Sequence, residues 1–224
     1  MNENRLKVLF ISSWYTTKVR PFLGIFILRR AMAIAEKCRV AAVYVCADEE
    51  GDIEEVEEDN IYTVRVYYKR VKVRPAVLAD IVKAARFLSE YRKGLKIYAN
   101  KFGKPDIINS NIVFPVSLIA LRLKRKWKVP YIISEHWTGY FPEDGRFRGV
   151  LLKIASKLVI KHASAMITDA EALKKRMLEL GLSNQYYAIP NVVDTGIFNI
   201  IPNRKNADSF NFIHVSALDD EQKN

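Results

Sequence analysis

The chain has 224 residues and a formal net charge of +11, and half of its residues are hydrophobic. This composition predicts a globular protein with a sizeable core and excludes a disordered or fibrous chain. The charge is unevenly spread, because residues 48–59 hold nine carboxylates and no base. We interpret this acidic run as a solvated, mobile loop between two strands rather than as a metal site.

Short apolar runs alternate with stretches of helical periodicity along the chain. The apolar runs predict strands at residues 8–12, 40–45, 61–68, 105–110, 130–136, 165–170 and 186–191. Helical spacing predicts helices at residues 22–37, 77–101, 114–127, 150–162 and 171–181. Because most of the runs are apolar throughout rather than alternating, we expect strands that are buried on both faces. The sequence therefore predicts an α/β fold with a Rossmann-like parallel sheet and helices on both faces.

The two cysteines, Cys38 and Cys46, stand at opposite ends of one predicted strand. A strand rises about 3.3 Å per residue, so the two thiols lie too far apart for a disulfide bond. Unpaired thiols favour a reducing compartment. The apolar run at residues 8–11 is too short for a signal peptide or a membrane span. We therefore predict a cytoplasmic protein, or one that lies on the cytoplasmic surface of a membrane.

Ligands of parallel α/β sheets bind at the carboxyl ends of the strands. No GxGxxG or GxxxxGK(S/T) motif occurs, which argues against a self-contained dinucleotide or nucleoside triphosphate site. Gly24 lies near the N-terminus of the first predicted helix, where free N–H groups suit an anionic or hydroxylated ligand. Pro21 and Gly24 are equally consistent with a turn that binds nothing. The three histidines do not have metal-ligand spacing.

The segment SEHWTGYF, residues 134–141, ends another apolar strand with a cluster of polar and aromatic side chains. Glu135 and His136 stand beside Trp137, and two further aromatic residues follow. Polar groups that bind hydroxyls and flat rings that cover C–H faces suit a sugar ligand. In the alternative interpretation, the aromatic residues cap the sheet and His136 is structural.

Four segments together resemble the N-terminal half of GT-B glycosyltransferases, in particular the large retaining family of many bacterial polysaccharide and lipopolysaccharide enzymes. Residues 8–35 resemble the first strand, the glycine-bearing loop and the first helix of that family. Residues 105–120 and 129–141 resemble two later strand ends. The most specific segment is YYAIPNVVDTGIF, residues 186–198, which resembles the crossover into the second domain.

The resemblance implies a division of the chain at the crossover. Residues 1–199 are expected to form the N-terminal, acceptor-side domain of the GT-B fold. Residues 200–224 are expected to be a linker and the first strand of a truncated donor-binding domain. On this interpretation the chain is a fragment of a longer protein and is inactive by itself.

The resemblance also assigns roles to individual residues. His136 matches the family histidine that reaches the donor sugar near the reacting carbon, and is the expected catalytic residue. Gly24 matches the first-loop glycine near the acceptor or the donor phosphate, and Lys223 matches a phosphate-contacting lysine. The remaining expected acceptor-binding residues are Phe22, Asn111, Glu135 and Trp137. The chain departs from the family pattern at three positions. Asn111 stands where a histidine is common, Ala217 replaces the usual phosphate-binding arginine, and Val192 replaces a frequent glycine at the crossover.

The implied reaction is transfer of a sugar, typically a hexose, from a nucleotide-sugar to a saccharide or lipid-linked acceptor with retention of configuration. No cofactor and no metal are expected, because lysine and arginine side chains stabilise the leaving group in this family.

A strongly basic region follows the acidic run. Residues 65–104 carry twelve Lys and Arg against two acids, and residues 122–128 add five more bases. The basic amphipathic helix at 77–101 suits contact with an anionic membrane surface, and equally suits a helix with a solvated basic side. A non-enzymatic basic α/β domain that binds a ligand or nucleic acid is the alternative function, but no motif for specific nucleic-acid recognition occurs.

Overall fold

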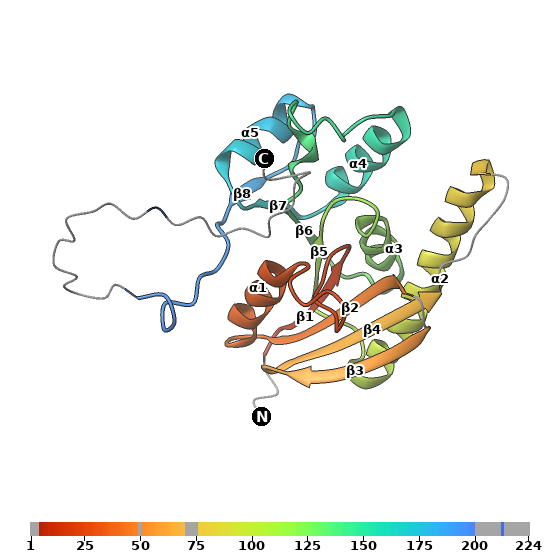
Figure 1. Ribbon diagram of the computed structural model, residues 1–224, viewed down its shortest axis with the longest axis vertical. Coiled ribbons are helices and arrows are strands. Elements are labelled where there is room, and N and C mark those ends of the chain that lie inside the picture. The colour runs from red at the N-terminus through yellow and green to blue at the C-terminus, as the bar shows by residue number, and fades with distance from the viewer. Residues whose placement is uncertain (1–4, 49–50, 70–75, 200–211, 213–224) are drawn as a thin grey trace. The chain divides into compact units, whose positions relative to one another are not determined.

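The computed structural model describes residues 5–48, 51–69, 76–199 and 212 (Figure 1). The chain divides into two compact units, Met1–Val192 and Val193–Asn224. The first unit contains all the helices and strands of the described residues. The expected donor-domain segment, residues 200–224, lies outside the described residues except for Phe212, which is exposed.

The elements alternate along the chain as the sequence predicts. The described strands are β1 Lys7–Ser12, β2 Arg39–Asp48, β3 Asp52–Glu58, β4 Ile61–Lys69, β5 Ile107–Asn111, β6 Tyr131–Glu135, β7 Ala165–Thr168 and β8 Tyr186–Ala188. The described helices are α1 Ile25–Ala35, α2 Ala76–Phe102, α3 Ser117–Trp127, α4 Val150–His162 and α5 Glu171–Glu179, with a short 3₁₀ turn η1 at Thr138–Tyr140.

The strands form one sheet in the order β3-β4-β2-β1-β5-β6-β7-β8. All neighbouring strands are parallel except β3 and β4, which are antiparallel. The chain first builds outward from β1 to β2 and then returns to place β5 on the other side of β1 (Figure 1). This reversal of strand order creates the crevice in which parallel α/β sheets bind ligands.

Helices cover both faces of the sheet, which confirms the predicted architecture. On one face, Ile27 and Ala31 of α1 pack with Phe10, Ala42 and Tyr44 of the sheet. The opposite face carries the larger core, to which α2, α3, α4 and α5 all contribute buried side chains. The strands between these two layers are apolar on both sides, and this explains their uninterrupted hydrophobic runs.

The interpretation of the acidic run as a loop is wrong, because Asp52–Glu58 forms the edge strand β3. The turn to β4 consists of Asp59 and Asn60, with φ angles of 52° and 61°. These two residues tolerate the left-handed conformation that a two-residue hairpin needs.

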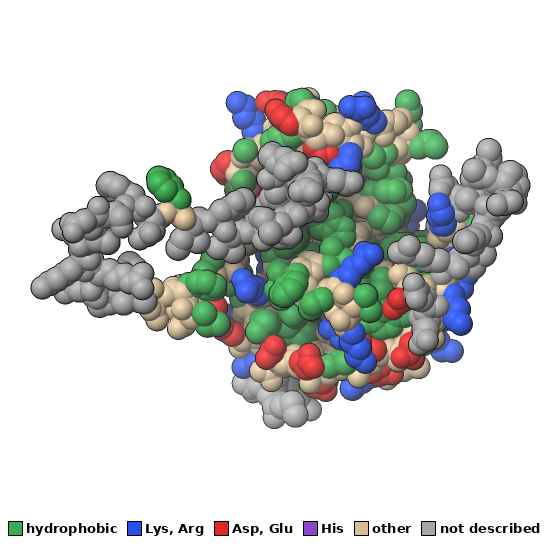
Figure 2. All heavy atoms as spheres, viewed as in Figure 1, with side chains coloured by type: hydrophobic (Ala, Val, Ile, Leu, Met, Phe, Trp, Pro, Cys, Tyr) green, Lys and Arg blue, Asp and Glu red, His purple; other side chains and the backbone are tan. Residues whose placement is uncertain are grey.

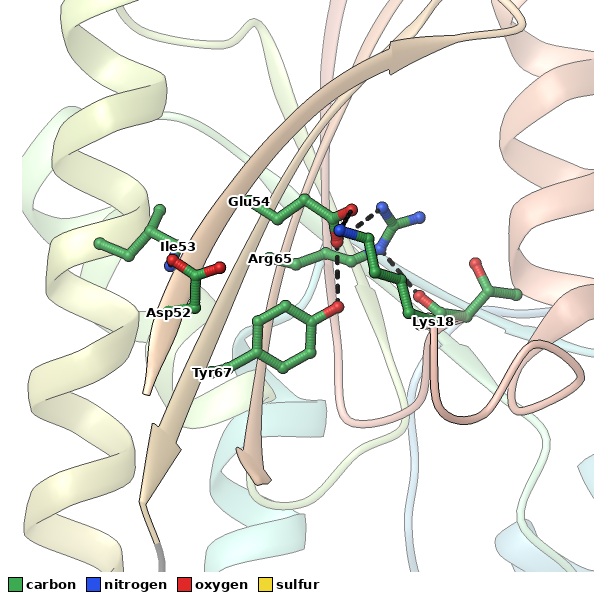
Figure 3. A network of polar contacts seen from close by, with 7 residues as sticks. Lys18, Asp52, Ile53, Glu54, Arg65 and Tyr67 are labelled. Atoms are coloured by element: carbon green, nitrogen blue, oxygen red, sulfur yellow. Dashed lines mark hydrogen bonds and ion pairs between the residues drawn. The ribbon is translucent and has the colours of Figure 1, made fainter. Parts of the chain in front are cut away.

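Side chains of β4 and of the loop after β1 compensate part of the negative charge of β3 at Glu54. Figure 3 shows Glu54 between Arg65, Tyr67 and Lys18. Its Oε2 lies 3.3 Å from Arg65 Nη1 and accepts a hydrogen bond of 3.0 Å from the Tyr67 hydroxyl. Lys18 Nζ, from the loop after β1, lies 3.0 Å from Oε1. Burial by itself would raise the pKa of Glu54. The hydrogen-bond donors and positive charges around the carboxylate outweigh this effect and hold the pKa below its ordinary value.

The basic helix of the sequence analysis is α2, and its apolar side faces inward. Tyr91, Leu95 and Tyr98 are buried in the larger core. Cys38 and Cys46 are both free thiols, as expected. Within the described ranges, every helix is too short or too polar to cross a bilayer.

Candidate functional site

The carboxyl ends of the central strands meet at one edge of the sheet. The register pairs Ser12 with Asn111, Asn111 with Ser134, and Glu135 with Thr168. The residues that follow these positions therefore share one edge, although they are far apart in sequence. Most of the predicted site residues lie there.

Gly24 is required by the backbone of the first loop. It has a φ of +69° and forms the N-cap of α1. A Cβ at this position would lie 2.9 Å from the carbonyl carbon and oxygen of Trp14. Only glycine combines this left-handed conformation with so close an approach of two chain segments. Phe22, two residues earlier, is 82% exposed.

Glu135 is completely buried, and its carboxylate organises the surrounding loops. Oε1 accepts hydrogen bonds from the amides of His136, at 2.8 Å, and Trp137, at 2.9 Å. Oε2 accepts from the Val113 amide at 2.8 Å and the Tyr140 hydroxyl at 2.9 Å. Burial raises the pKa of Glu135, and these four hydrogen bonds counteract part of the rise. Both carboxylate oxygens already accept hydrogen bonds from the protein and are inaccessible to solvent. Glu135 therefore positions the surrounding backbone rather than contacting an acceptor.

His136 follows directly and is also buried. Its ring packs on Phe26 of α1, with ring centroids 4.8 Å apart. Nδ1 lies 3.7 Å from Oδ2 of Asp169, which follows β7. Neither ring nitrogen has a hydrogen-bond partner among the described residues. Buried nitrogens without partners are uncommon in folded proteins.

Arg30 of α1 is another buried polar side chain near this edge, and sequence reasoning missed it. One of its amino groups, Nη2, donates to the Ile189 carbonyl at 3.0 Å and lies 3.3 Å from Asn191 Oδ1. The other, Nη1, has no partner in the described residues. Burial lowers the pKa of Arg30, and the charge of Asp169 opposes this. Arg30 and Asp169 thus connect α1 with the ends of β7 and β8.

Asn111 and Trp137 are two further residues that the sequence analysis placed at this edge. The Asn111 amide group is buried and lies 3.4 Å from the Asn109 carbonyl, while its Oδ1 has no partner in the described region. The half-buried Trp137 ring packs against Tyr140, with centroids 5.3 Å apart. A Cβ on Gly139 would lie 2.2 Å from the Trp137 ring, so glycine is needed there. Lys223 lies outside the described residues.

A cavity of about 440 Å³ opens at the carboxyl ends of β2 and β4, next to the first loop. It contains none of the residues around His136. Burial is the main cause that raises the pKa of the Cys46 thiol in this cavity, to about 11, so the thiol is protonated at neutral pH. The lining residues are Thr17, Val19, Arg20, Tyr44, Cys46, Ala47, Asp48 and Tyr67. No group of three or more metal-ligating side chains occurs in the described part of the chain.

The fold and this edge define an α/β domain of the GT-B class, and sequence comparison agrees. The profile of Glycosyltransferase Family 4 matches residues 27–196, which is more than half of the chain. The chain therefore belongs to glycosyltransferase family 4. No curated protein matches it in sequence.

Solved structures resemble this chain in fold. A sucrose-phosphate synthase from Thermosynechococcus elongatus superposes with a TM-score of 0.60 at 14% identity, over 83% of this chain and 48% of that chain. UGT2 of Phytolacca americana, without ligand, superposes with a TM-score of 0.51 at 9% identity, over 86% of this chain and 53% of that chain. The chain thus spans about half the length of these two proteins.

Proposed function

We propose that this chain supplies the acceptor-side half of a retaining glycosyltransferase that acts in bacterial polysaccharide or lipopolysaccharide synthesis. The observation that best supports this is the imidazole of His136, buried at the carboxyl edge with both nitrogens unpartnered among the described residues. Leaving such groups unpaired is unfavourable by about 1–3 kcal/mol each. A sugar hydroxyl that reaches the ring would restore a hydrogen bond.

The donor in this proposal is a nucleotide-sugar, typically of a hexose. His136 contacts the transferred sugar, and Phe26 and Asp169 hold the ring in place. Gly24 lets the N-terminus of α1 lie close to the donor phosphate or the acceptor. Lys223 is proposed to contact the phosphate. Positive side chains, rather than a metal ion, stabilise the nucleotide that leaves.

The acceptor, a saccharide or a lipid-linked sugar, is proposed to lie along the first loop. The cavity beside that loop is within the usual size of small-molecule sites, which is about 300–1,000 Å³. Arg20, Thr17 and the Asp48 carboxylate offer polar groups to sugar hydroxyls, and Tyr44 and Tyr67 offer ring surface. Phe22, which is exposed, and Trp137, which is half-buried, remain proposed acceptor contacts, whereas Asn111 is as deeply buried as Glu135. We place the reaction in the cytoplasm.

A donor screen with the full gene product that contains this chain tests the proposal. The protein is incubated with UDP-, GDP- and ADP-linked hexoses and with simple saccharide acceptors, and nucleotide release and product are measured. We expect one donor to give a glycoside whose anomeric configuration, determined by NMR, is that of the donor. We also expect EDTA to leave the rate unchanged. An inverted product would contradict retention, and no transfer with any donor and acceptor would contradict the function.

A further inference from the structure

Helix α4 presents a row of large aliphatic side chains to solvent. Val150 is 71% exposed, Leu151 84%, Ile154 58% and Leu158 41%. With 3.6 residues per turn, Val150, Ile154 and Leu158 stack along one side of the helix, and Leu151 adjoins them. Figure 2 shows hydrophobic side chains projecting from the molecule in the region of α4. Such a continuous apolar row at the surface indicates an interaction site.

A row of lysines flanks the aliphatic row. Lys153, Lys157 and Lys161 recur at intervals of four residues, and α4 contains no acidic residue. None of the three forms an ion pair with another residue that the structure describes. The helix therefore offers uncompensated positive charge beside exposed apolar surface.

The opposite side of α4 is packed in the larger core, so the helix is held firmly against the domain. Val159 and Ile160 lie in the larger core, and Ser156 is buried as well. The Tyr131 hydroxyl donates to the Val159 carbonyl at 2.5 Å. At the end of the helix, Lys124 Nζ of α3 donates to the His162 carbonyl at 2.7 Å.

We propose that α4 binds the surface of an anionic lipid bilayer, with Leu151 and Ile154 inserted among the acyl chains and the lysines at the headgroups. A helix with an apolar side and a lysine-rich polar side has the pattern of interfacial helices. The neighbouring helix α3 carries a further exposed base, Arg125. The basic helix α2 does not offer such a surface, because its apolar residues Tyr91, Leu95 and Tyr98 are buried in the larger core.

Charge favours a bilayer over a second copy of the chain. Pairing two α4 helices along their aliphatic rows would bring two sets of unpaired lysines together, on molecules that each carry a net charge of +11. Anionic lipids instead compensate the lysines. The proposal goes beyond sugar transfer, and vesicle binding can be measured without any activity.

Cosedimentation of the chain with vesicles tests the proposal. We expect binding to vesicles of phosphatidylglycerol and phosphatidylcholine that weakens with salt, and little binding to phosphatidylcholine alone. The variant L151D/I154D should reduce the affinity by about tenfold or more, because it removes the inserted side chains. The variant K153Q/K157Q keeps the apolar row and should reduce affinity by about fivefold for each lysine.

Matched variants elsewhere on the surface serve as controls. L178D changes an aliphatic residue of α5 that is 41% exposed, and K37Q/K104Q removes two exposed lysines away from α4. Both should bind vesicles like the parent chain, and circular dichroism should show that every variant is folded. The proposal is overturned if the parent chain does not bind anionic vesicles, or if folded L151D/I154D binds as the parent does. Self-association that L151D/I154D abolishes, without vesicle binding, would assign the surface to a second copy instead.

Discussion

The amide nitrogen of Val113 lies 2.8 Å from Oε2 of Glu135, and this hydrogen bond ties the turn after β5 to the end of β6. The same carboxylate holds the amides of His136 and Trp137 through its other oxygen. The backbone on each side of His136 is therefore fixed by one buried acid. The geometry of the candidate site therefore depends on that acid.

Replacing Glu135 by glutamine should destabilise the domain by about 2–4 kcal/mol. The amide group of glutamine presents N–H donors, whereas Val113, His136 and Trp137 all donate to the native carboxylate. Urea denaturation of the purified chain measures the change. E143Q, at an exposed position in the same loop region, should shift stability by less than about 0.5 kcal/mol. Equal stability of the two variants would refute the organising role of Glu135.

Alanine at Gly24 should be more harmful than alanine at Gly103. Both glycines have a positive φ, at +69° and +71°, so both substitutions cause about 1–2 kcal/mol of backbone strain. Only at Gly24 does the new Cβ meet other atoms, at 2.9 Å from Trp14, while nothing lies within 4 Å at Gly103. The difference between the melting temperatures of the two variants measures how much the contact with Trp14 destabilises the fold. Identical melting temperatures would show that the first loop adapts freely.

Arg30 should hold the segment after β8 in place. Arg30→Met removes the contacts to the Ile189 carbonyl and Asn191, and we expect a loss of about 2–3 kcal/mol. The Ile189 amide, which donates to Thr168 at 2.8 Å, should exchange its hydrogen faster in this variant. Arg29 is exposed on the same helix, so R29M is the control. Unchanged exchange at Ile189 in R30M would contradict the assignment.

Glu54 should stabilise the edge strand only when it is ionised. Its pKa is lowered in the folded state, so its contribution is complete above the unfolded value of about 4.3 and is lost as pH falls through the folded value. E54Q should therefore be less stable than the parent at pH 7, by about 1–2 kcal/mol. The difference should shrink as the pH falls below about 4.3 and should disappear only below the lowered pKa of the folded state. Melting temperatures of both proteins between pH 3 and pH 7 would test this, and a difference that stays constant would count against it.

The sequence predicted the parallel core because uninterrupted apolar strands such as Val8–Ile11 can only be buried on both faces. It did not predict β3, because acidic residues are unfavourable in strands and their charge suggested a loop. What stabilises β3 is the set of partners that Arg65, Tyr67 and Lys18 provide to Glu54. Those partners depend on tertiary pairing, which a single sequence does not display.

The residues of the candidate site were also only partly predictable from the sequence. The sequence could propose His136 and Gly24 as candidates because each follows a recognisable strand in a segment with a distinctive residue pattern. Arg30 and Asp169 could not, because their importance comes from the neighbouring positions of α1, β7 and β8. The inward direction of Glu135 was equally hidden, since an acid at a strand end more often faces solvent.

The role of His136 is the central claim, and the transfer rate of the full gene product carrying H136A tests it most directly. With a soluble acceptor and the preferred donor, we expect kcat to fall by about 100-fold or more, because the group beside the reacting sugar is removed. H162A, at the end of α4, should keep the parental rate, and circular dichroism should show that both variants are folded. A folded H136A enzyme that transfers sugar at the parental rate would contradict the account.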